Sequence, residues 1–213
     1  MALRDIFLDP PPRRDMPARL VRLAIGLVMF GVGVSLMVRS ELGLSPWEVL
    51  HQGISFRTGI LLGTVGIIVG FFVLFGWIPL REKLGIGTVA NVVMIGIVID
   101  LTLWRLPEEF TNLGVRWALL IGGITMIGVG TSLYIGAGLG PGPRDGLMTG
   151  LAKRGWAIGI VRTALELSVL AAGWILGGTV GIGTVLFALG VGPIVHWTLP
   201  FLTLEPSAPE KIA

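Results

Sequence analysis

Residues 128–147 read GVGTSLYIGAGLGPGPRDGL, and residues 31–50 read GVGVSLMVRSELGLSPWEVL. The two stretches lie 97 residues apart and are identical at nine of their twenty positions. Further along the chain the match continues in the same order, and after a deletion of one residue GIGTV at 85–89 corresponds to GIGTV at 181–185. A collinear match of this extent favours two copies of one structural unit over a chance likeness between glycine-rich helices.

The composition places these two copies in a membrane. Mean hydropathy is +0.86 and only 14% of the residues are charged, whereas about a quarter are charged in an average soluble domain. A helix needs about 20 apolar residues to cross the hydrocarbon core of a bilayer. Six apolar runs reach this length, and we expect spans at 20–38, 60–79, 85–103, 117–136, 157–176 and 181–199. The expected organisation is a tail at 1–19, membrane repeats at 20–106 and 107–200, and a second tail at 201–213.

The distribution of basic residues predicts the orientation of the spans. If the N-terminus is cytoplasmic, eleven Lys and Arg residues fall on the cytoplasmic side and four on the other side. This bias is typical of bacterial inner-membrane proteins, so we expect both termini in the cytoplasm. Because each copy holds an odd number of spans, the second copy enters the membrane from the opposite side. The sequence therefore predicts an all-α membrane protein with six transmembrane helices arranged as two inverted three-helix repeats.

A pattern of turn residues follows the first span of each copy. It reads Leu-Gly-x-x-Pro-x-acidic-x-Leu and occurs at 42–50 and 139–147. We expect its glycine to end the preceding helix in a left-handed C-cap, and its proline to take the first position of a new helix. In the first copy, Ser45 is expected to cap that helix. The segment that follows is too short to span, so each copy is expected to carry a short interfacial or re-entrant helix.

The starts of these two short helices are candidate binding elements. A helix N-terminus exposes free N–H groups that bind anions, and the guanidinium of Arg144 is suited to clamp a carboxylate or a sulfonate. In the functional interpretation both starts face one cavity and bind an anionic group. In the alternative interpretation they are ordinary turn devices that packing requires. The candidate substrate-binding residues at these starts are Pro46, Trp47 and Glu48 in the first copy, and Pro143, Arg144 and Asp145 in the second.

Ionisable residues also occur within the expected spans. Arg162 and Glu166 are four residues apart, so they share a helix face on which they can pair. A charge at membrane depth is costly and marks a pathway or a buried partner, so both are candidate substrate-binding residues. The alternative is that Arg162 extends to the nearby interface and Glu166 neutralises it. Asp100 and His196 occupy matching places in the two copies and are expected to be interfacial caps, with proton relays as the alternative.

Several chemistries are excluded by what the chain contains. It has no cysteine and only two histidines, which lie far apart in the sequence. No pairing of a nucleophile with a base, no metal-binding spacing and no phosphate-binding loop is present, so we expect no enzyme activity, no catalytic residue, no metal and no cofactor. The basic residues follow the membrane topology, so we expect no nucleic-acid partner.

Four motifs carry a resemblance to a known family. They are LGLSPW at 42–47, LGPGPRDGLM at 139–148, VRTALE at 161–166 and GWILGGTVGIGTV at 173–185. In these motifs the chain resembles the YczE family of bacterial membrane proteins, within the wider YczE/YitT group, over nearly its whole length apart from the tails. The resemblance implies a six-helix inner-membrane protein, linked in some members to secondary-metabolite production or encoded beside regulators of the pyridoxal-phosphate-binding type. It supplies no catalytic residues.

Interrupted helices between inverted repeats recur in secondary transporters, where they form the solute site. We therefore expect a small secondary transporter or exporter of an organic solute with an anionic group. Its expected partners are the lipid bilayer and that solute, and homo-oligomer formation stays open. Two alternatives remain, namely a substrate-binding subunit of the energy-coupling-factor type and a non-transporting membrane partner of a cytoplasmic enzyme.

Overall fold

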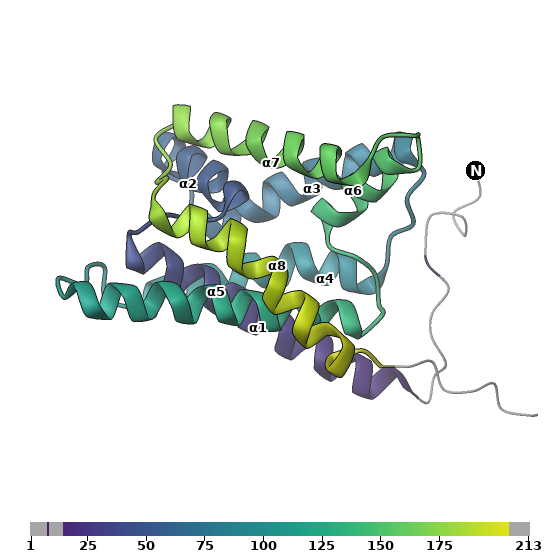
Figure 1. Ribbon diagram of the computed structural model, residues 1–213, viewed down its shortest axis with the longest axis horizontal. Helices are drawn as coiled ribbons and strands as arrows, with labels where there is room; N and C mark the ends of the chain where they lie inside the picture. The colour runs from purple at the N-terminus through teal and green to yellow at the C-terminus, as the bar shows by residue number, and fades with distance from the viewer. Residues whose placement is uncertain (1–7, 9–14, 205–213) are drawn as a thin grey trace, which may run out of the picture.

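The computed structural model describes residue 8 and residues 15–204, and this part of the chain is built from α-helices (Figure 1). Six of these helices are long and apolar enough to cross a membrane, as expected. Each begins and ends within four residues of the span expected from the sequence. The six are α1 (Met16–Ser40), α3 (Leu62–Leu80), α4 (Ile86–Arg105), α5 (Leu113–Gly136), α7 (Ile158–Ile175) and α8 (Ile182–Leu202).

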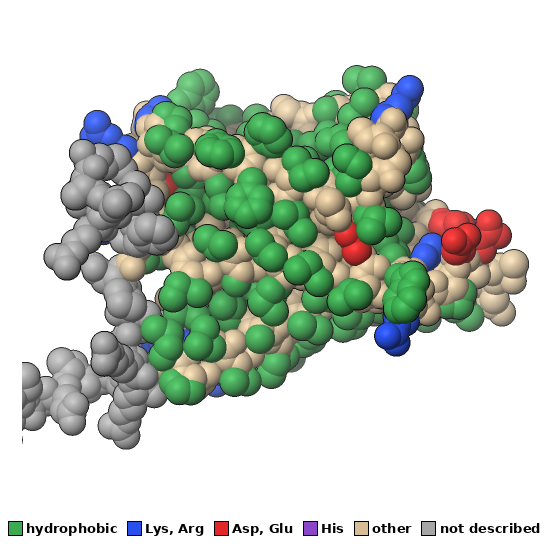
Figure 2. All heavy atoms as spheres, turned by 180° about the vertical axis from the view of Figure 1, so that it is seen from behind, with side chains coloured by type: hydrophobic (Ala, Val, Ile, Leu, Met, Phe, Trp, Pro, Cys, Tyr) green, Lys and Arg blue, Asp and Glu red, His purple; other side chains and the backbone are tan. Residues whose placement is uncertain are grey.

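Two further helices are too short to span. They are α2 (Pro46–Thr58) and α6 (Pro143–Ala152), and each begins at the proline that the turn pattern predicts for a helix start. Figure 1 shows them near opposite ends of α7. On the opposite face of the molecule, hydrophobic side chains cover the middle while Lys and Arg lie toward the two ends (Figure 2). This distribution suits a bilayer that surrounds the long helices.

The expected tails, 1–19 and 201–213, lie for the most part outside the described residues. Their inner ends belong to helices, because α1 begins at Met16 and α8 ends at Leu202. Arg19, which was expected in the first tail, is buried in α1 and donates a hydrogen bond to the carbonyl oxygen of Ala137 at 2.8 Å. The first span is therefore longer than its apolar run, since this arginine finds a backbone partner.

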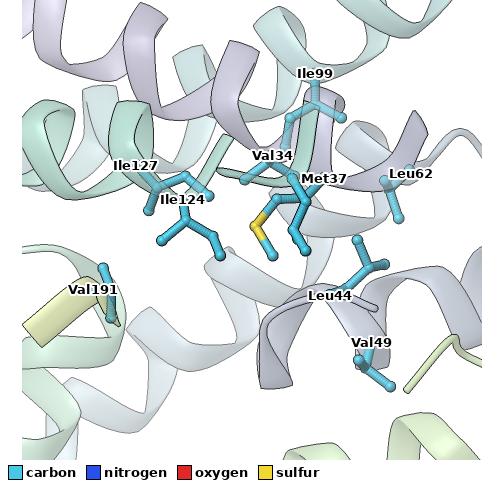
Figure 3. Packing of buried hydrophobic residues seen from close by; sticks show 10 residues of the cluster. Val34, Met37, Leu44, Val49, Leu62, Ile99, Ile124, Ile127 and Val191 are labelled. Carbon is cyan, nitrogen blue, oxygen red and sulfur yellow. The ribbon is translucent and has the colours of Figure 1, made fainter. Parts of the chain in front are cut away.

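Helices α1 and α5 pack closely along their length at two pairs of glycines. A Cβ atom added to Gly26 would lie 2.7 Å from the carbonyl oxygen of Gly130, and one added to Gly33 would lie 2.7 Å from that of Gly123. Small residues allow such backbone approach between membrane helices. Beside this contact, apolar side chains fill the centre, and Figure 3 shows those of α1, α4 and α5 together with residues at and around the start of α2.

The segments that follow α1 and α5 are fastened to helices far away in the sequence. The carbonyl oxygen of Leu42 accepts a hydrogen bond from the amide of Gly183 in α8 at 2.7 Å. The carbonyl oxygen of Leu139 accepts one from the amide of Gly87 in α4 at 2.9 Å. The Thr88 hydroxyl adds a bond of 2.8 Å to the carbonyl of Pro141. Each half of the chain is thus held by backbone contacts to the other half.

The glycines of the turn pattern have a different role from the one expected. Helix α1 is capped by Glu41 at φ 53°, and α5 ends at Gly136, so Gly43 and Gly140 do not form the C-caps. Both have left-handed backbone angles, φ 118° and φ 124°, in the loops that follow. A Cβ atom on Gly43 would lie 2.7 Å from the amide nitrogen of Gly181, so the close approach to another helix start also requires glycine. The C-cap prediction was wrong because the sequence does not reveal this neighbour.

Asp100 is a cap, as expected, although the helix that it caps is a neighbour. Its carboxylate on α4 accepts hydrogen bonds from the amides of Gly63 and Thr64 at the start of α3, at 2.6 and 2.9 Å. This contact and a glycine contact hold α3 and α4 side by side. Helix α7 packs instead on α2 and α6, and α8 packs on α5, while α7 and α8 make almost no contact with each other.

Candidate functional site

A cavity of about 460 Å³ lies between the starts of α2 and α6 and the long helices around them. The elements that line it come from both halves of the chain. All eight residues singled out in the sequence are on its wall, namely Pro46, Trp47, Glu48, Pro143, Arg144, Asp145, Arg162 and Glu166. The two short helices therefore face one shared cavity with their N-terminal turns.

An ion pair joins the two helix starts across this cavity. Nη2 of Arg144 on α6 donates to Oε1 of Glu48 on α2 at 2.5 Å. The guanidinium also lies over the ring of Trp47, 5.0 Å from its centroid, in a cation–π contact. The Glu48 side chain is only 4% exposed, whereas that of Arg144 is 29% exposed. The sequence left Arg144 open toward a solute, but here a carboxylate of the chain itself lies against it.

Two buried polar atoms near this pair lack hydrogen-bond partners among the described residues. They are the hydroxyl oxygen of Ser45 and the indole nitrogen of Trp47. Ser45 holds the N-cap position of α2, as expected, yet its hydroxyl makes no capping bond. Buried polar groups without a partner cost free energy, so this end of α2 retains unused capacity for hydrogen bonding.

Asp145, in the first turn of α6, is a second acid of the cavity wall and is half-buried. The hydroxyl of Tyr134 on α5 donates to its Oδ2 at 3.1 Å. Burial raises the pKa of Asp145 above its usual value, while the Tyr134 hydrogen bond and the charge of Arg144 oppose that rise. The environment therefore favours the neutral form of this carboxyl group more than water does.

His51 lies one helical turn after Glu48 on α2. Its Nδ1 is 3.9 Å from Oε1 of Glu48. Burial lowers the pKa of His51 to about 4, against the opposing charge of Glu48 and with a smaller contribution from Arg144. The imidazole is therefore neutral near pH 7 and adds a polar group to the cavity wall without adding a charge.

Helix α7 contributes the remaining ion pair. Nε of Arg162 donates to Oε1 of Glu166 at 3.0 Å, the pairing that their spacing predicts. These side chains are more open than the pair between the short helices, with exposed fractions of 57% and 31%. The cavity thus holds two guanidinium groups, each already matched by one carboxylate.

The rest of the wall is largely apolar, and several of its polar residues were not predicted as site residues. Tyr134, His51 and Asn91 were missed, and His196, which was expected to be an interfacial cap, lines the cavity. Tyr134 carried a usable signal, since it is the only tyrosine of the chain and its hydroxyl lies within an apolar span. No group of three or more His, Asp and Glu side chains that could hold a metal ion occurs within residues 15–204.

Comparison with known proteins gives a family and three relatives of unassigned function. Residues 17–200 match the family of unknown function DUF6198. An "Uncharacterized protein" of Haemophilus influenzae is 40% identical over 190 residues, which are 89% of this chain and 87% of that protein. The "Uncharacterized membrane protein YczE" of Bacillus subtilis is 38% identical over 191 residues, 88% of each chain. The "Uncharacterized protein YyaS" of the same organism is 29% identical over 184 residues, 84% of this chain and 90% of that protein. The expected resemblance to the YczE family is thereby confirmed, and no solved structure matches.

Proposed function

This chain belongs to the DUF6198 family, and we propose that it is a small secondary transporter or exporter of an organic solute with an anionic group. The observation that carries the proposal is the pairing of Arg144 with Glu48 between two helix starts inside one cavity. In this proposal the protein is in the bacterial inner membrane with both termini in the cytoplasm, as the distribution of basic residues predicts.

Contacts between matched positions support two inverted repeats. Trp47 and Arg144 are matched in the alignment of the two copies and lie in contact. The contact of Gly26 with the carbonyl of Gly130 is likewise matched by that of Gly123 with the carbonyl of Gly33. Contacts of this reciprocal kind are expected where a two-fold axis relates two units. Under that symmetry α2 and α6 re-enter the membrane from opposite faces, and their starts meet near the middle.

The surroundings of Arg144 favour an anionic group on the solute. Glu48 already occupies one side of the guanidinium, which indicates that the position accommodates a carboxylate. Among the described residues Arg144 makes no other hydrogen bond, so its remaining N–H donors face the cavity. The guanidinium of Arg144 lies over the ring of Trp47, and its planar group of N–H donors suits bidentate binding of a carboxylate or sulfonate. The unpartnered Ser45 hydroxyl and Trp47 N–H nearby add unused hydrogen-bonding capacity.

The location of the ion pairs on the cavity wall favours transport over the alternative of a non-transporting membrane partner of a cytoplasmic enzyme. A surface that docks a cytoplasmic enzyme would carry its charges on the outside, whereas Glu48 is buried and both Glu48 and Asp145 line the cavity. The volume of about 460 Å³ lies within the range of about 300–1,000 Å³ that is typical of small-molecule sites. The apolar remainder of the wall suits the organic part of a solute.

The test is binding and transport of defined anions by the protein in lipid nanodiscs and proteoliposomes. A panel of carboxylates, sulfonates and phosphonates is screened by thermal unfolding, and those that stabilise the protein are then followed by radiolabel counterflow. The double variant Arg144→Gln/Glu48→Gln removes one charge of each sign, so it preserves the charge balance while it removes the anion-binding group. We expect it to lose both stabilisation and counterflow.

Arg57→Gln is the matched control, because Arg57 is exposed and bonds only to the carbonyl of Leu176 among the described residues. It should respond to anions as the native protein does. If the double variant binds every anion as tightly as the native protein, Arg144 is not the anion site. If no anion stabilises the native protein, the scaffold alternative is favoured.

A further inference from the structure

The seam between the last two helices of the chain is open, whereas the matching seam in the first half is closed. Gly63 and Gly96 bring α3 and α4 together so closely that a Cβ atom on Gly96 would lie 2.5 Å from the carbonyl oxygen of Gly63. In the second half, Gly192 matches Gly96, yet a Cβ atom there would have nothing within 4 Å. The cavity is therefore bounded by two helices, α7 and α8, that hardly touch.

The capping carboxylate of the closed seam is also missing from the open one. Asp100 ties α4 to the first amides of α3, but its matched residue in α8 is His196, which instead lines the cavity. Helices α7 and α8 are joined by the short segment 176–181 at one end, and Figure 1 shows them diverging toward the other end. The opening lies on the side of the molecule, between two membrane-spanning helices.

The two walls of this opening differ in polarity. Helix α7 lines the cavity with the ion pair of Arg162 and Glu166, and 57% of the Arg162 side chain is exposed. Apart from His196, helix α8 lines the cavity with glycine and apolar residues, among them Phe187, Val191 and Val195. If lipid tails filled this opening, the ion pair of α7 would have no polar contacts with its surroundings. If water filled it, the apolar side chains of α8 would be exposed to water.

From these two walls we infer that the solute is amphipathic, with its anionic group at Arg144 and its apolar chain projecting between α7 and α8 into the bilayer. This inference rests on the proposed function and specifies the substrate class of the same site. A solute of this kind meets both walls at once, because its head lies among the guanidinium groups while its chain contacts α8. It enters the cavity sideways from the membrane.

The experiment compares N-acylglycines of increasing chain length, which share one carboxylate head. Acetylglycine, octanoylglycine and dodecanoylglycine are titrated, below their micelle concentrations, onto the protein in nanodiscs, and affinity is read from the rise of the unfolding midpoint. Each methylene that leaves water for an apolar wall contributes about fourfold in affinity. We expect octanoylglycine to bind at least about tenfold more tightly than acetylglycine.

Two matched glycine variants distinguish binding of the acyl chain in the opening from simple partition of the compound into lipid. Gly192→Leu narrows the mouth of the cavity, and Gly122→Leu places the same side chain on α5, where a Cβ atom also meets nothing within 4 Å and which is not part of the cavity wall. We expect Gly192→Leu to lose the gain from chain length while it still binds acetylglycine. Gly122→Leu should keep the gain.

Three outcomes overturn the inference in distinguishable ways. Equal binding of the short and long compounds refutes the amphipathic solute and leaves the anion site standing. If no N-acylglycine binds and no anion of the wider panel stabilises the protein, the proposed function is refuted as well. A dimer in native mass spectrometry that Gly192→Leu dissociates, with no binding of long chains, assigns the open seam to a second copy of the chain.

Discussion

The ion pair between Arg144 and Glu48 should be far more sensitive to loss of the cation than to loss of the acid. Glu48 is 4% exposed, so Arg144→Gln leaves a buried carboxylate without its cation, which costs about 3–5 kcal/mol. Arg144 is 29% exposed, so after Glu48→Gln its guanidinium still faces the cavity and Trp47, and the cost falls to about 1–2 kcal/mol. The double variant should cost about as much as Glu48→Gln alone. The coupling free energy then equals the cost of Arg144→Gln, about 3–5 kcal/mol.

The assay is equilibrium unfolding in mixed micelles of dodecyl maltoside and SDS, followed by tryptophan fluorescence at pH 8. Arg144→Lys completes the set, because it retains the charge while it loses the planar guanidinium. Costs that are equal for the two single variants, or that add up in the double variant, would refute the ion pair as the link between the two helix starts.

Three further predictions concern topology, acid stability and helix packing. Cysteines are introduced one at a time at Thr111 and Trp156 of this cysteine-free chain. The cysteine at position 111 should react with a membrane-impermeant maleimide from outside the cell, and the one at position 156 should react only after cell lysis. The reverse pattern would contradict the proposed orientation. Because the pKa of His51 is lowered to about 4 from 6.5, the stability that its neutral form contributes is present above pH 6.5 and is lost as the pH falls toward 4, by about 3 kcal/mol in all. His51→Gln should therefore flatten the acid side of a plot of unfolding midpoint against pH, and an unchanged slope would show that His51 does not carry it. Gly63→Ala should destabilise the protein by more than about 1 kcal/mol, since its Cβ atom would collide with a carbonyl of α4. Gly192→Ala should be neutral or stabilising by about 0.5–1 kcal/mol, because its Cβ atom would meet no neighbour. Similar unfolding midpoints for the two variants would contradict the difference between the closed and the open seam.

The sequence predicted well those features that depend on local pattern. Six apolar runs of spanning length became six helices, and the prolines at 46 and 143 marked the starts of the short ones. The spacing of Arg162 and Glu166 predicted their pairing, because residues four apart on a helix are neighbours wherever that helix lies. Six of the eight candidate residues lie on one cavity because the matched turn patterns of the two copies are brought together, and α7 adds Arg162 and Glu166.

Partners that depend on how distant helices meet were not predictable from local pattern. Arg144 and Glu48 are 96 residues apart, and only the packing of helices from both halves of the chain brings them together. The role of Gly43 was misjudged for the same reason, since its closest neighbour is the start of α8. Tyr134 stands out in the sequence as the only tyrosine of the chain, but local pattern does not show that its hydroxyl meets Asp145.

The hydrogen bonds that join each half of the chain to the other half limit when the protein can fold during its synthesis. When the ribosome has released only the first half, the amide of Gly87 and the hydroxyl of Thr88 have no acceptors, because Leu139 and Pro141 are not yet made. The carbonyl of Leu42 has no donor until later still, because the amide of Gly183 belongs to the last long helix. Because unsatisfied backbone groups are costly within a bilayer, we expect the first half to reach its final structure only after the second half has been inserted. The insertion of α8 is thus expected to complete the folding of both halves.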